Sequence, residues 1–97
     1  MKAVFIVYNQ AMGDIVMDAL DQLQIRGFTQ WENVQGRGSK KGDPHMGSHT
    51  WPALNTATLC MVEDQQVEPL LELLERIDKQ AELQGMRSFV WNIEQSR

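Results

Sequence analysis

The chain has 97 residues and a formal net charge of −4, with 42% hydrophobic and 23% charged residues. These values are typical of one globular domain, 1–97, and they exclude a disordered chain. The negative charge also excludes bulk attraction to nucleic acid or to an anionic membrane, so we expect neither a nucleic-acid partner nor membrane insertion.

The N-terminal run and the cysteine content predict where the protein resides. The apolar run Ala3–Tyr8 is too short for a signal peptide, and no cleavage motif follows it. No stretch approaches the length of a membrane-spanning helix. The single cysteine, Cys60, cannot form an internal disulfide, which suits a reducing compartment. We therefore expect a cytoplasmic protein.

The first part of the chain predicts a strand, a helix and a second strand. Ala3–Tyr8 is a nearly continuous run of β-branched, aromatic and other apolar residues, which indicates a buried strand. Phe28–Val34 is rich in strand-forming residues. Between them, Ala11–Arg26 is predicted to be an amphipathic helix that stops at Gly27. Its apolar residues recur at three- and four-residue spacing: Ile15, Val16, Ala19, Leu20 and Leu23.

The second part predicts a strand, a longer helix and a final strand. Thr56–Val62 is the strand, and Asp64 is a suitable N-cap for a helix over Gln65–Gln84 that Gly85 closes. Met86–Ile93 follows as the last strand. The apolar stripe of the helix consists of Val67, Leu70, Leu71, Leu74, Ile77 and Ala81.

The order of these elements predicts an α+β fold. Strand, helix, strand, strand, helix, strand is the ferredoxin-like βαββαβ arrangement, a four-stranded antiparallel sheet with two helices on one face. We expect Phe89, Trp91 and Ile93 to share a face, and Trp31 and Trp91 to lie in the core or at a subunit interface. This fold hosts many unrelated activities, so it does not by itself fix the function.

A long flexible loop at about 36–55 separates the two halves. It contains four of the seven glycines, both histidines and two of the three prolines. A connection of this length inside a compact domain usually has a function. Its first part, Gly36–Gly42, combines glycines with Arg37, Lys40 and Lys41, a combination that can bring backbone N–H groups and positive charge to a phosphate. A solvated flexible loop is the alternative.

The second part of the loop contains candidate metal ligands. His45 and His49 are four residues apart, and Asp43 precedes them. Imidazole and carboxylate groups suit a divalent ion such as Zn²⁺ or Cu²⁺. Hydrogen-bonding or partner-contacting histidines are the alternative. Trp51 is expected to anchor the return of the loop by burying its ring.

Five passages resemble the PII signalling proteins and their PII-like relatives, and the most specific is the glycine-rich basic one. They are Lys2–Val7, Asp14–Leu20, Ile25–Thr29, Val34–Gly42 and Val62–Leu70. The resemblance implies a homotrimer with ligand sites in the clefts between subunits. It also implies that the long loop, the T-loop of that family, contacts a target enzyme or membrane transporter. The residues implied to hold the phosphates of ATP or ADP are Gly36, Arg37, Gly38, Ser39 and Lys40.

The sequence also departs from that family. PII proteins have a second glycine-rich basic motif before the last strand, whereas Gln80–Arg87 contains one glycine and one arginine. The loop has no tyrosine for the family's modification. The candidate ligands are therefore an adenine nucleotide or a divalent metal ion.

The leading hypothesis is a non-enzymatic regulator. We find no carboxylate pair or nucleophile–base set that a reaction would need. The alternatives are a metal-binding protein similar to CutA, or a small ferredoxin-like enzyme that uses the loop histidines.

Overall fold

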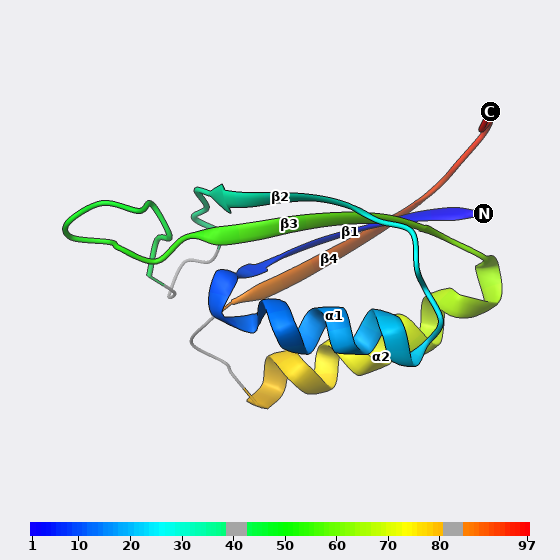
Figure 1. Ribbon diagram of the computed structural model, residues 1–97, viewed down its shortest axis with the longest axis horizontal. Helices are drawn as coiled ribbons and strands as arrows, with labels where there is room; N and C mark the ends of the chain where they lie inside the picture. Colours follow the sequence, from blue (N-terminus) through cyan, green and yellow to red (C-terminus); the bar gives the residue numbers. More distant parts are fainter. Residues whose placement is uncertain (39–42, 81–84) are drawn as a thin grey trace.

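Four strands form one antiparallel sheet in the computed structural model, which describes residues 1–38, 43–80 and 85–97. The sheet order is β2-β3-β1-β4. The elements are β1 (Lys2–Asn9), the short 3₁₀ helix η1 (Gln10–Met12), α1 (Gly13–Gln22), β2 (Thr29–Val34), β3 (Asn55–Val62), α2 (Asp64–Gln80) and β4 (Met86–Asn92). Both helices cover the same face of the sheet (Figure 1). The predicted ferredoxin-like fold is confirmed.

The core lies between the sheet and the two helices. In β1, alternate residues face the helices, and Val4, Ile6 and Tyr8 are at most 1% exposed. Their neighbours on β3 include Thr58 and Cys60, which are equally buried. The helices contribute their apolar stripes to this core, with the buried residues Val16, Ala19, Leu20, Leu70, Leu74 and Ile77.

The opposite face of the sheet, which we call the outer sheet face, is also apolar. The strand register places on it Ala3, Phe5, Val7, Trp31, Ala57, Leu59, Met61, Phe89 and Trp91, with Arg87 at one end. Four of the large side chains are exposed by 47–53%. Phe89 and Trp91 share this face as predicted, whereas Ile93 lies beyond the strand. Trp31 and Trp91 are therefore outside the core of this chain.

Helix α1 differs from its predicted form at both ends. It ends at Gln22, where Arg26 was expected, and Gln24 adopts a positive φ of 60°. The Ile25 N–H donates to the Leu20 carbonyl at 2.9 Å, and the Gln24 N–H donates to the Asp21 carbonyl at 3.0 Å. These two bonds form a Schellman motif, in which Ile25 is buried against the core. At the other end, α1 begins at Gly13, where Ala11 was expected, since Gln10–Met12 form η1. Ile15, predicted in the apolar stripe, is 52% exposed and is not part of the buried core.

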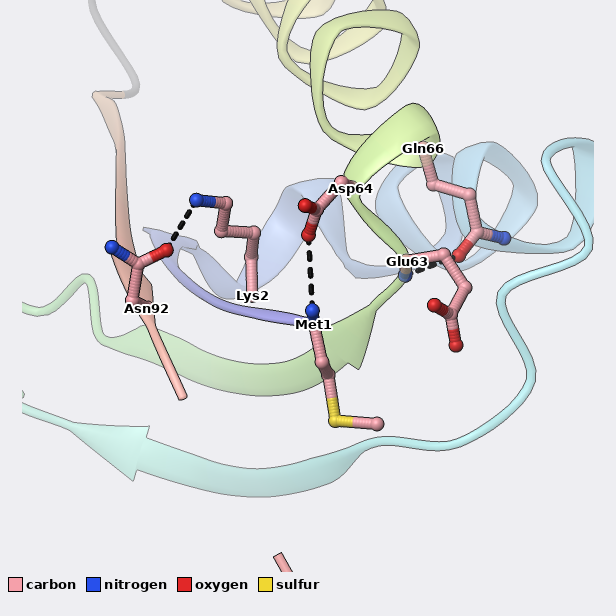
Figure 2. A network of polar contacts seen from close by, with 6 residues as sticks. All are labelled: Met1, Lys2, Glu63, Asp64, Gln66 and Asn92. Atoms are coloured by element: carbon pink, nitrogen blue, oxygen red, sulfur yellow. Dashed lines mark hydrogen bonds and ion pairs between the residues drawn. The ribbon is translucent and has the colours of Figure 1, made fainter. Parts of the chain in front are cut away.

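Helix α2 begins at Asp64, so Asp64 is not the residue that precedes the helix as predicted. The Glu63 N–H instead donates to Gln66 Oε1 at 2.8 Å, which satisfies a backbone donor at this end. Asp64 Oδ1 accepts a hydrogen bond from the Met1 amine at 3.0 Å (Figure 2). The Met1 amine lowers the pKa of the exposed Asp64 carboxyl by this hydrogen bond and by its charge. Ala81 and the predicted helix end at Gln84 lie outside the described residues.

The two ends of the sheet differ in what they carry. Both chain termini lie at one end, and the long loop leaves from the other end, near the start of β4 (Figure 1). Among the described residues, neither helix combines the length and the apolarity that a bilayer crossing requires.

Candidate functional site

The base of the long loop is held together by backbone pairing. The Gly36 N–H donates to the His45 carbonyl at 2.7 Å, and the His45 N–H donates to the Gly36 carbonyl at 2.6 Å. The two residues thus form an isolated antiparallel bridge just beyond the end of β2. The sequence does not predict this bridge, because no local pattern relates two positions nine residues apart.

The far part of the loop, Met46–Leu54, folds back on itself, and we call it the loop lobe. The Gly47 N–H donates to the Ala53 carbonyl at 3.1 Å, and the Ser48 N–H donates to the Trp51 carbonyl at 2.9 Å. Gly47 has φ +63°, and a Cβ there would lie 2.7 Å from Leu54 Cδ2. Glycine is therefore favoured at this turn, because any other residue meets both a strained backbone conformation and the Leu54 side chain.

His45 has its side chain inside the protein rather than on the loop surface. It is 9% exposed, and its Nδ1 lies 2.5 Å from Asn55 Oδ1 at the start of β3. The Asn55 amide nitrogen lies on the other side, against Gly36, where a Cβ would clash with it. The structure thus gives Gly36 a steric role: its missing side chain makes room for Asn55.

An open groove of about 540 Å³ lies beside this bridge. Gln35, Gly36, Arg37, Pro44, Met46 and Trp51 line it. The Gln35 side-chain amide donates to the Met46 carbonyl at 2.8 Å and so joins the two limbs of the loop. Trp51 remains 39% exposed, so the prediction that its ring is buried is wrong. The groove offers a guanidinium next to an aromatic ring and a thioether.

The predicted phosphate-contacting residues fall into three groups. Gly36 and Arg37 line the groove. Gly38 is exposed and has no neighbouring atom within 4 Å of an added Cβ. Ser39 and Lys40 lie outside the described residues. The structure therefore brings two of the five residues to one concave surface.

The predicted metal ligands do not converge in the part of the chain that the structure describes. His45 Nδ1 is occupied by Asn55, while Asp43 and His49 are exposed. No three His, Cys, Asp or Glu side chains come close enough to hold a metal ion among the described residues. A metal site at Asp43, His45 and His49 stays a prediction without geometric support.

Two titratable side chains lie in the core, away from the loop. Burial raises the pKa of the Cys60 thiol to about 11, which keeps the thiol protonated near neutral pH. Burial also raises the pKa of Tyr8, whose hydroxyl lies 2.8 Å from Thr58 Oγ1. Cys60 is thus a small buried residue in a β-strand, as its position in the sequence indicates.

The charge of the loop differs in sign from that of the rest of the chain. Residues 36–55 contain three Lys or Arg and one Asp, whereas the remaining residues contain six Lys or Arg and twelve Asp or Glu. The loop therefore has a net charge of +2 and the remainder has −6. An anionic ligand or surface is attracted to the loop and repelled by the rest of the molecule.

A comparison with protein families identifies the chain. The sequence model of one family, described as Nitrogen regulatory protein P-II, matches residues 1–97. This chain belongs to the P-II family. The predicted resemblance to PII-like proteins is thus confirmed. A search of curated protein sequences found no match.

Solved structures of PII-like proteins share the fold. The structure of CPII from Thiomonas intermedia bound to ADP and bicarbonate has a TM-score of 0.76 at 25% identity, covering 95% of this chain and 84% of CPII. A CPII structure with ADP, AMP and bicarbonate also has a TM-score of 0.76, at 24% identity, covering 99% and 92%. A protein of Thermus thermophilus described as PII-like has a TM-score of 0.62 at 22% identity, covering 95% and 85%.

Two residues of the site were missed by sequence reasoning. Asn55 was taken only as the end of the loop, and Gln35 was not assigned a role. Asn55 is the partner of both His45 and Gly36, and Gln35 spans the loop. The sequence shows only an asparagine directly before a predicted strand, and its burial in the structure is what requires hydrogen-bond partners for the amide.

Proposed function

We propose that this protein is a cytoplasmic, non-enzymatic regulator that binds an adenine nucleotide at the base of its long loop. In this proposal it works as a homotrimer and contacts a target enzyme or transporter through the loop. The observation that carries the proposal is the groove beside Gly36 and Arg37, on a chain of the P-II family. A concave surface with few polar groups, one of them cationic, is typical of a ligand site.

The chemistry of the groove suits a phosphorylated ligand. The Arg37 guanidinium can bind phosphate oxygens with two parallel hydrogen bonds. Gly38 has open space around it, so a phosphate can approach its backbone. CPII, which is similar to this chain at 25% identity, is described as bound to ADP and bicarbonate. ADP is therefore the first ligand to test.

The second half of a nucleotide site is reduced in this chain. Gly85 directly precedes β4 and has a positive φ of 77°, and Arg87 follows two residues later. The register with Val7 places Arg87 on the outer sheet face. We propose that a neighbouring subunit completes the site, since residues on that face become available where subunits meet.

The homotrimer is supported by the outer sheet face. Trp31, Met61, Phe89 and Trp91 expose about half of their surface there. A continuous apolar surface of this kind marks an interaction site. Burial of such surface contributes about 25 cal/mol per Å², so association would stabilise a chain this small.

The contact with a target is supported by the charge and shape of the loop. The loop carries a net charge of +2, and Trp51 is exposed at its far part. Tryptophan and arginine are frequent at the centres of protein interfaces. We therefore propose an acidic surface on the target.

Isothermal titration calorimetry tests the nucleotide proposal. The trimeric protein is titrated with ADP, AMP and ATP, and the Arg37→Ala variant is expected to bind at least tenfold more weakly, because a charged hydrogen bond is lost. Arg26→Ala is the matched control, since Arg26 is exposed after α1 and away from the groove. Absence of heat with all three nucleotides, or equal binding by both variants, would contradict the proposal.

A further inference from the structure

Three segments that are distant in the sequence meet at the His45 side chain. Its backbone pairs with Gly36 at the end of the outgoing limb, and its ring contacts Asn55 at the start of β3. The ring also faces Gly85, where a Cβ would lie 4.0 Å from His45 Cε1. His45 thus lies where the loop base, the sheet and the start of β4 come together.

The orientation of Asn55 fixes the direction of the hydrogen bond. Its amide nitrogen lies against Gly36, so its Oδ1 faces the histidine ring. Because a carbonyl oxygen can only accept, His45 Nδ1 carries the proton and donates it. Among the described residues, no buried side-chain nitrogen or oxygen lacks a partner, so the contact leaves no unsatisfied group behind.

We propose that His45 and Asn55 are positioning residues that fix the loop base in a shape ready for the nucleotide phosphates. We call this pair and its fit against Gly36 the clasp. The role toward nucleotide rests on the proposed function, whereas the clasp itself is a property of the free protein. The clasp holds Gly36, at the edge of the groove, against His45 and Asn55, the two residues that flank the loop lobe.

The physical reason is the entropy of the loop. A connection of twenty residues samples many conformations, and ordering it on binding weakens the affinity. A loop that is already held in the binding shape avoids this cost. When only a fraction of the molecules has that shape, the apparent affinity falls in proportion to the fraction.

The first experiment measures the clasp without any nucleotide. Amide hydrogen exchange, resolved by NMR, is followed at Gly36 and His45, whose N–H groups form the bridge. In His45→Phe, which keeps a ring but removes the Nδ1 donor, these amides are expected to exchange about tenfold faster, the equivalent of one lost buried hydrogen bond. His45→Asn, which restores a donor near the Nδ1 position, is expected to recover most of the protection.

Two controls separate the clasp from general loosening. His49→Phe is the same substitution at the exposed histidine of the same loop, and it is expected to leave both amides unchanged. The Ile25 amide, bonded to the Leu20 carbonyl at the far end of α1, reports local opening away from the loop and is expected to stay constant in all variants. Equal exchange of Gly36 and His45 in wild type and His45→Phe would overturn the clasp.

The second experiment measures positioning, with ADP as the probe. The ADP affinity of His45→Phe is expected to fall by the same factor as its clasped fraction, which the exchange protection of the Gly36 and His45 amides gives, and this factor reaches about ten when a tenth of the molecules stay clasped. His45→Asn is expected to bind within about threefold of wild type, and His49→Phe should match wild type. An ADP affinity that does not follow the clasped fraction across wild type, His45→Phe and His45→Asn would overturn the positioning role. If wild type binds no ADP, the nucleotide function and the positioning role both fail, while the exchange experiment still decides whether the clasp exists.

Discussion

The fit between Gly36 and Asn55 makes a prediction that a double-mutant cycle can test. An added Cβ at Gly36 clashes with the Asn55 side-chain nitrogen. Gly36 does not have the positive φ that Gly47 and Gly85 have, so its backbone accepts alanine without conformational strain. The cost of Gly36→Ala is therefore the cost of this one contact. Asn55→Ala removes the atom that the new methyl group meets.

The expected magnitudes follow from these contacts. Gly36→Ala overpacks the loop base and should lower the free energy of unfolding by about 1–3 kcal/mol. Asn55→Ala leaves the buried His45 Nδ1–H without an acceptor and should also cost about 1–3 kcal/mol. In the Asn55→Ala background, Gly36→Ala should cost less than about 0.5 kcal/mol. The two substitutions thus couple by more than about 0.5 kcal/mol and by up to about 3 kcal/mol, above the scatter of independent sites.

Urea denaturation at one fixed protein concentration gives the four free energies of the cycle, because stability of an oligomer depends on concentration. Gly38→Ala is the matched control. Gly38 has open space around it and should tolerate alanine with a change of less than about 0.5 kcal/mol. Equal costs of Gly36→Ala in both backgrounds would refute the account of the loop base.

Three further predictions concern other parts of the molecule. Gln24 has φ 60° at the end of α1, a conformation that glycine adopts at less cost, so Gln24→Gly should raise the free energy of unfolding by about 1 kcal/mol in urea denaturation. An unchanged or lower free energy of unfolding would contradict the Schellman motif at this helix end. Cys60 has a pKa of about 11 instead of 9.0, so at pH 8 a thiol reagent should modify the folded protein about a hundredfold more slowly than the urea-unfolded protein. Equal labelling rates of the folded and the unfolded protein would contradict the burial of Cys60. Because the pKa of Cys60 is higher in the folded protein than in the unfolded one, the contribution of the protonated thiol to the free energy of unfolding is fully present below pH 9 and is lost as the pH rises toward about 11. Phe89→Glu should dissociate the proposed trimer, whereas Ile15→Glu on the exposed side of α1 should not. Light scattering after size exclusion should show a mass near 11.1 kDa for the first variant only, and an unchanged mass of Phe89→Glu would contradict the proposed interface.

The strands and the core could be predicted because their signals are local. The nearly continuous apolar run of β1 indicates a buried strand by composition and length alone, and the residues of β3 indicate a strand in the same way. The end of α1 could not be predicted in the same way. Gly27 is the better stop by propensity, but ending at Gln22 allows Ile25 to be buried and its N–H to bond Leu20. Tertiary burial outweighed the local cost of a positive φ at Gln24.

The candidate site was predictable in position but not in its interactions. The glycines and cationic residues of the loop indicate Gly36–Gly42 as a phosphate-contacting segment, which stays a prediction, and Gly36 and Arg37 of this segment line the groove. From composition alone, the role expected of Gly36 is to let a phosphate approach the backbone. Its fit against Asn55 depends on a side chain nineteen positions away, which no local pattern connects to it. The sequence likewise does not show that His45 is buried beside Asn55 while His49 is exposed, because burial is a property of the whole fold.

The most direct test of the central claim is to locate the ADP site by NMR. ADP is titrated into the ¹⁵N-labelled wild-type protein, and the shifts of the backbone amides are followed. The largest changes are expected at the amides of Gly36, Arg37 and Gly38, the loop-base residues beside the groove. The proposed nucleotide site is contradicted if ADP at millimolar concentration moves no amide, or if the changes cluster elsewhere and leave these three in place.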